Sequence, residues 1–175
     1  MKFKSTIGLV CCLMTLQSCW LGGNDVEDPL TVNPPNDFYE PIIMQREEFE
    51  TTTSFQTAPE PMMNTGKIYV KDNFIFINEK DKGFHIIDNA DRSNPEPVAF
   101  LRVLGSSDLS IKGSTVYVNN ATDLLALDID TQAGTLEIKK RIANTFPQLR
   151  SPFGQTFWNL DENEIIVGWQ ISEDN

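Results

Sequence analysis

The sequence predicts an all-β protein that is built from repeated four-stranded antiparallel sheets, arranged as the blades of a β-propeller. The first observation is a repeat of three short strand-like segments, which lie at residues 68–72, 74–78 and 84–88 and recur at 109–113, 115–119 and 124–128. The two copies are 41 residues apart at the start and 40 apart at the aspartates that end them, Asp88 and Asp128. A propeller blade has a period of roughly 40–50 residues. The spacing therefore indicates one blade per copy.

The second observation is the composition of residues 74–77, which read Phe-Ile-Phe-Ile without alternation. A strand that is apolar on both faces has to be covered on both faces. Inner strands of propeller blades meet this condition, because neighbouring blades lie on either side of them. We therefore expect each repeat to pack against another.

The remaining strands follow from the same pattern. Residues 89–97 are rich in Asn, Asp and Pro, which favour turns, and residues 98–103 then form a fourth strand that begins after Pro97. In the second copy the fourth strand is at 135–142. Two further strands, at 157–160 and 165–169, give the opening half of a third blade. We expect about two and a half blades in an incomplete ring, since closed propellers have roughly 4–8.

The first residues have the pattern of a secretory signal. Lys2 and Lys4 precede an apolar stretch at residues 7–16, which is too short to span a bilayer and has the length of a signal-peptide core. Leu-Gln-Ser-Cys follows, and it resembles the lipobox of bacterial lipoproteins. The resemblance implies that Cys19 becomes the lipid-modified N-terminus, carrying palmitate. The alternative is a conventional signal peptide that is cut near Ser18.

Residues 19–64 contain many glycines and prolines, which predict a flexible tether. Within it, residues 39–49 are expected to form one helical turn or two and to pack on the first blade. Asp25, Glu27 and Asp28 resemble the surface-export signal of Bacteroidetes lipoproteins, and the alternative is a solvated acidic spacer. The predicted organisation is a signal peptide at 1–18, the tether at 19–64, and three blade regions at 65–105, 106–143 and 144–175.

The first repeat also resembles a known family. Gly-Phe-His-Ile-Ile-Asp at residues 83–88, followed by an Asn-Pro-Glu-Pro turn at 94–97, resembles the LVIVD-repeat proteins, which are propeller-like lipoproteins common in Bacteroidetes. The resemblance extends from Gly66 to about Ile142. The second copy, Leu-Leu-Ala-Leu-Asp at 124–128, has lost the glycine and the histidine. The family's members are usually longer, which implies that this chain corresponds to the N-terminal part of one. Either the reading frame is shortened, or a partner chain supplies the missing blades.

Few residues have the pattern of a reactive site. His85 is the only histidine, so no cage of several histidines and no Cys–His pair is available. We expect His85 to be a packing residue, and the alternative is that it faces a ligand. Asp88 and Asp128 end equivalent strands, and they either line one mouth of a propeller and face a ligand or cap turns with their carboxylates. We assign no catalytic residue, no metal site and no cofactor.

Two weaker patterns have structural explanations that fit them better. Residues 128–134 resemble a calcium loop, but the glycine and the acidic residue fall at the wrong positions, so a hairpin turn explains them better. Trp158 and Trp169 are candidates for stacking on a sugar. Because both lie in predicted strands, we expect them to be buried.

The sequence-based hypothesis for function is a non-enzymatic binding or scaffold protein. It would be anchored by lipid in the cell envelope, on the periplasmic or surface face of an outer membrane, and would bind a protein or a glycan. The net charge of −11 and the lack of a basic cluster exclude nucleic acid as an expected partner. The alternative is a truncated fragment, either of an envelope hydrolase or of a longer propeller without independent activity.

Overall fold

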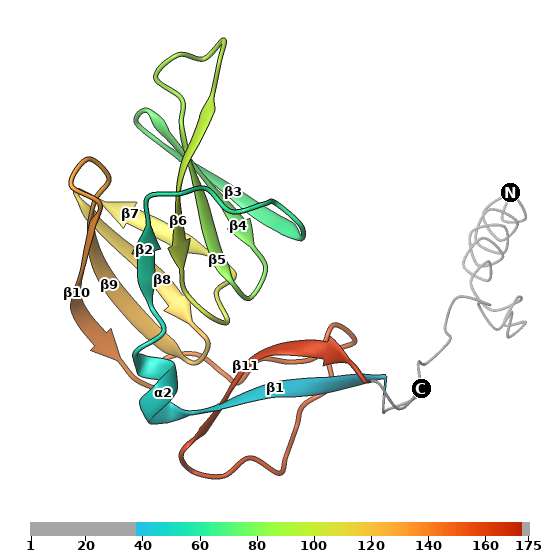
Figure 1. Ribbon diagram of the computed structural model, residues 1–175. Helices are drawn as coiled ribbons and strands as arrows, with labels where there is room; N and C mark the ends of the chain where they lie inside the picture. The colour runs from blue at the N-terminus through green and yellow to red at the C-terminus, as the bar shows by residue number, and fades with distance from the viewer. Residues whose placement is uncertain (1–37, 173–175) are drawn as a thin grey trace, which may run out of the picture. The chain divides into compact units, whose positions relative to one another are not determined.

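The computed structural model describes residues 38–172. Figure 1 shows its elements in chain order. They are β1 (Tyr39–Gln45), α2 (Arg46–Glu50), β2 (Ser54–Gln56), β3 (Thr65–Lys71), β4 (Phe74–Glu79), β5 (Gly83–Asp88), β6 (Glu96–Arg102), β7 (Leu109–Lys112), β8 (Thr115–Asn120), β9 (Asp123–Asp130), β10 (Thr135–Ile142) and β11 (Glu164–Ile171).

The protein is all-β and its sheets are antiparallel. The first sheet has five strands in the order β2-β6-β5-β4-β3, and the second has four in the order β10-β9-β8-β7. In both, four consecutive strands follow one another through hairpins, as the repeated pattern predicted. The strands expected in the two copies are confirmed, with boundaries that shift by a few residues at most.

The two copies also share their strand register. Phe76 pairs with Ile86 in the first sheet, and the equivalent residues Tyr117 and Ala126 pair in the second. The β3–β4 and β7–β8 hairpins both have two-residue turns whose first residue has positive φ, Asp72 at 53° and Gly113 at 63°. A positive φ at this position matches the twist of a tight hairpin. The same backbone path is therefore formed twice.

One loop explains why the repeat spacing changes from 41 to 40 residues. Three residues connect β4 to β5, whereas Ala121 and Thr122 alone connect β8 to β9. Asp81 and Ala121 occupy equivalent places in these loops, and both have positive φ, 60° and 47°. The second copy therefore reaches the same turn with one residue fewer.

The main core lies between the first and second sheets. Its buried residues come from facing sides of the two sheets: Phe76, Phe84, Ile86, Ala99, Leu101 and Val103 from the first sheet and its end, and Leu109, Val116, Val118, Leu125 and Leu127 from the second. Each fully buried Val, Leu, Ile or Phe side chain contributes about 1.5–3 kcal/mol. The expectation that the repeats cover each other is confirmed for these two faces.

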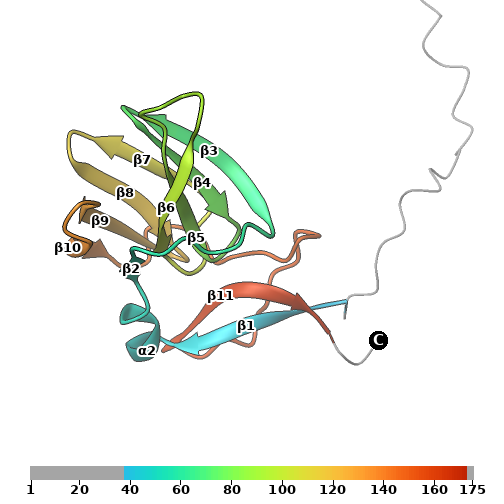
Figure 2. The same cartoon turned by 45° about the horizontal axis from the view of Figure 1, so that its top comes forward.

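A third sheet joins distant parts of the chain, because β1 pairs with β11. Figures 1 and 2 show this two-stranded sheet next to the ends of the two larger sheets. Its buried Ile165 and Val167 pack with Phe49 of α2 and with Ala121 in the β8–β9 turn. These contacts attach the third sheet to the turns of the second.

The third sheet corrects several predictions. One helical turn forms within the expected segment, at Arg46–Glu50, but residues 39–45 before it form a strand that was not predicted. The flexible tether does not extend to residue 64, since β2 pairs with β6. No strand forms at 157–160, because β11 takes its partner from the N-terminal side of the repeats.

Other predictions lie outside the described residues. These are the signal peptide at 1–18, Cys19 and the acidic residues that follow it. Between residues 38 and 172, α2 is the single α-helix, and it has 5 residues. No helix in this part of the chain has the length and apolar character needed to cross a membrane.

Candidate binding groove

An open groove lies along one face of the second sheet, on the side that points away from the first. Its volume is about 560 Å³. Tyr117 and Leu124 contribute from β8 and β9, and Ser110 contributes from β7. The segment 146–150, which follows β10, supplies the opposite wall. We call this site the groove.

Charged and aromatic groups surround the groove. Lys67 of β3 forms an ion pair with Asp108 at one end, and Arg150 lines the wall segment. The rings of Tyr117 and Phe146 are both partly exposed, and they provide apolar surface beside these charges. A concave site with apolar surface and a few convergent polar groups is the usual form of a ligand pocket.

Asn119 fixes the backbone beside the groove. Its side-chain oxygen accepts hydrogen bonds from the backbone N–H groups of Ser107 and Asp108, at 2.9 and 3.1 Å. Its amide nitrogen donates to the carbonyl of Gly105 at 3.0 Å. Asn119 is therefore a structural residue that shapes the 105–108 loop.

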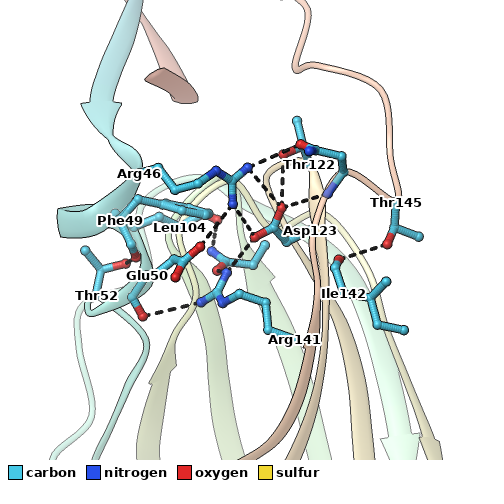
Figure 3. A network of polar contacts seen from close by, with 12 residues as sticks. Arg46, Phe49, Glu50, Thr52, Leu104, Thr122, Asp123, Arg141, Ile142 and Thr145 are labelled. Atoms are coloured by element: carbon cyan, nitrogen blue, oxygen red, sulfur yellow. Dashed lines mark hydrogen bonds and ion pairs between the residues drawn. The ribbon is translucent and has the colours of Figure 1, made fainter. Parts of the chain in front are cut away.

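A buried carboxylate, that of Asp123, anchors the wall of the groove, and Figure 3 shows the polar contacts around it. Asp123 is fully buried, and it accepts hydrogen bonds from Arg46 at 3.0 Å and from Arg141 at 2.8 Å. It also accepts the backbone N–H of Asn144 at 3.1 Å. The N–H of Phe146 donates to the Thr122 carbonyl at 2.8 Å. The chain that leaves β10 is thus attached to the β8–β9 turn just before it enters the groove wall.

The same contacts determine the charge state of Asp123. Burial alone would raise the pKa of this carboxyl, but the hydrogen bonds from Arg46, Arg141 and the Asn144 N–H outweigh burial and lower the pKa. Asp123 is therefore ionised at neutral pH. Arg46 comes from α2 and Arg141 from β10, so one carboxylate joins three separate parts of the chain.

The repeat explains why an aspartate has space at this position. Asp123 begins β9 where Gly83 begins β5. A Cβ atom on Gly83 would lie 2.1 Å from the Leu101 carbonyl oxygen, so the first copy admits only glycine there. In the second copy, the position of Asp123 has room for a side chain. The substitution of glycine by aspartate at a repeat-equivalent position was the available sequence signal for this network.

His85 lies in the first sheet, away from the groove residues. It is buried, and its Nε2 lies 3.1 Å from a carboxylate oxygen of Glu79. Its ring packs against Phe100 with centroids 4.9 Å apart. Glu79 also accepts the backbone N–H groups of Met63 and Asn64. His85 is a packing residue that helps to hold the chain entering β3.

The two repeat-equivalent aspartates have different contacts. Asp88 accepts the N–H of Ala90 at 2.8 Å, which is a turn cap. Asp128 lies 3.8 Å from the ammonium group of Lys139. The turn after β9 is capped by Asp130, which accepts two backbone N–H groups. These bonds are those of the hairpin turn expected at 128–134.

The two tryptophans differ from the expectation of burial. Trp158 is 86% exposed, because residues 157–160 lie in a loop and not in a strand. Trp169 is half-buried in β11 and lines a second hollow of about 520 Å³ together with Tyr39 and Phe157. The prediction was wrong for Trp158 because it depended on a strand that does not form.

No protein-family model, curated protein or solved structure matches the chain. The fold and the site define the class of protein: it is an all-β protein with antiparallel sheets and an open groove on the second sheet.

Proposed function

We propose that the protein is a non-enzymatic binding or scaffold module of the bacterial cell envelope, held at a membrane by lipid on Cys19. The groove is its binding site, and its partner is a protein or a glycan. Function depends on such sites more than on the fold that carries them.

One observation supports this proposal above the others. The wall of the groove is fixed by a buried ion network, in which Asp123 contacts Arg46, Arg141 and the backbone of Asn144. The network holds the chain in place directly before the wall segment 146–150. A fixed wall lowers the entropy that is lost when a partner binds, and preorganisation of this kind increases affinity.

The finer architecture belongs to the same proposal. We infer that the two repeats are propeller-like blades of the LVIVD type, within a ring that this chain leaves incomplete. The equal register of the two sheets and their face-to-face core support this view. The order of the first sheet supports it as well, because its four repeat strands follow one another as they do in a blade.

The anchor is tested by growing expressing cells with labelled palmitate. We expect label on the wild-type protein and none on Cys19→Ala. Cys12→Ala is the matched control, since it removes a nearby cysteine from the apolar segment, and it should keep the label. Equal labelling of wild type and Cys19→Ala would end the lipoprotein proposal.

The groove is tested separately by measuring binding to an array of bacterial envelope glycans and to purified envelope proteins. Tyr117→Ala, which removes an exposed ring from the groove, should weaken binding by about tenfold or more, because a buried aromatic contact is typically a large part of an interface's energy. Trp158→Ala is the control, as it removes an exposed ring from a loop outside the groove. Equal loss in both variants, or none in either, would contradict the assignment.

A further inference from the structure

The first sheet has an apolar face that no element between residues 38 and 172 covers completely. Ile68 and Val70 of β3 are 65% and 60% exposed, and Ile75 and Ile77 of β4 lie beside them on the same face. We call these four residues the aliphatic face. Contiguous exposed apolar residues of this kind mark interaction surfaces.

The second copy of the repeat shows what residues at these four positions contact. The residues of the second copy at the same repeat positions are Leu109, Ile111, Val116 and Val118. They pack in the main core against the first sheet, and three of the four are buried. The same positions therefore form an interface in the second copy, whereas in the first copy Ile68 and Val70 are exposed and Ile75 and Ile77 are half-buried.

The groove-bearing face of the second sheet corresponds to the other side of the core interface. In the core, the second sheet packs on a face of the first that carries Phe76, Phe84 and Ile86. The equivalent residues in the second copy are Tyr117, Leu124 and Ala126, and Tyr117 is 38% exposed. Two of these, Tyr117 and Leu124, line the groove. The outer face of the first sheet therefore carries one side of this interface, and the outer face of the second sheet carries the other side.

We propose that copies of this chain associate head to tail, with the aliphatic face of one copy packed on the groove-bearing face of the next. This inference rests on the proposed role of the groove as a binding site, and it names the partner as a second copy of the chain. The interface inside each molecule is its template. Because the two faces differ, the contact is heterologous, and it closes into a ring or continues as a filament.

A second copy fits these two faces better than a symmetric dimer does. A two-fold contact would place one aliphatic face against another and would leave the groove-bearing face of both copies open. The head-to-tail contact instead repeats the pairing found in the core, in which aliphatic residues meet Phe76, Phe84 and Ile86. It covers both open faces of every interior copy.

The test uses analytical ultracentrifugation of the full chain in a density-matched detergent, over a range of protein concentrations. Wild type should form a closed ring or larger assemblies as concentration rises. Val70→Glu, which places a charge on the aliphatic face, and Tyr117→Glu, which places one in the groove, should each sediment as a monomer. Ile171→Glu, at an exposed apolar residue of β11, is the control and should assemble as wild type does.

Mixing the two variants gives the decisive result. Val70→Glu retains an intact groove, and Tyr117→Glu retains an intact aliphatic face. An equimolar mixture should therefore sediment at twice the monomer mass and grow no further. A monomeric wild type, a mixture that stays monomeric, or a single variant that still assembles would overturn the proposal.

Near-ultraviolet circular dichroism of each variant shows whether it is folded. Ile68→Lys, also on the aliphatic face, provides a second variant if Val70→Glu does not fold, and it too should be monomeric. A monomeric wild type whose binding to an envelope glycan depends on Tyr117 would refute self-association and leave the proposed function intact. A wild-type protein without palmitate label would refute the proposed anchor and leave self-association intact, because self-association does not require the anchor.

Discussion

Replacement of Asp123 by alanine should destabilise the protein by about 3–5 kcal/mol, which is the usual cost of breaking a buried charged pair by removing one partner. The carboxylate is fully buried and accepts hydrogen bonds from two guanidinium groups, from the Asn144 N–H and from the Thr122 hydroxyl. Alanine removes all four acceptor contacts. Arg46 and Arg141 keep partial access to water, so we expect a value near the lower end of this range.

The measurement is the free energy of urea unfolding of wild type and variant, monitored by tryptophan fluorescence. Asp123→Asn keeps the shape but removes the charge, and it should also be destabilised by about 2 kcal/mol or more, because Arg141 loses its counter-ion and Arg46 keeps only Glu50. Glu47→Ala, on the exposed side of α2, is the control and should change stability by less than about 0.5 kcal/mol. An Asp123→Ala protein within about 1 kcal/mol of wild type would refute the view that this network holds the groove wall.

Three further predictions concern the two larger sheets. Gly83→Ala should destabilise by about 3 kcal/mol or more in the same urea assay, since its Cβ would meet the Leu101 carbonyl and its φ of 151° is strained for alanine. Leu127→Ala, in the core, should cost about 2–5 kcal/mol, and a loss below about 1 kcal/mol would contradict its burial. Burial raises the pKa of Glu79, but the contact with His85 and the hydrogen bonds from two backbone N–H groups outweigh burial and lower the pKa. The stability that the ionised Glu79 provides is complete above the unfolded-state pKa and is lost as pH falls through the folded-state pKa. Unfolding free energy should therefore fall below about pH 4.5, and Glu79→Gln should flatten that slope.

The strands of the two repeats could be predicted because their signals are local. Alternating and continuous apolar residues, turn residues and a constant spacing all fall within short stretches. The face-to-face core followed from one such signal, the uninterrupted apolar run at 74–77. These features depend on neighbours in sequence, which a single chain reveals.

The features that were missed depend on contacts between distant residues. β1 became a strand because β11 pairs with it, and Tyr39 and Ile171 are far apart in sequence. Asp123 gained its role from Arg46 and Arg141, which lie 77 and 18 residues away. No periodic pattern joins these three residues. Trp158 was misplaced for a related reason, since β11 paired with β1 and the expected strand beside it did not form.

The β1–β11 pair also determines the order in which the molecule can be completed. β1 is synthesised before either repeat, yet its partner emerges only after both larger sheets have been made. Contacts between residues so far apart form slowly, because the intervening chain must first be ordered. β1 therefore has no partner strand until the chain has been made through residues 164–171. We expect the β1–β11 pair to form after the two larger sheets, so in pulse-labelled hydrogen exchange the β1 amides should become protected later than those of the two larger sheets.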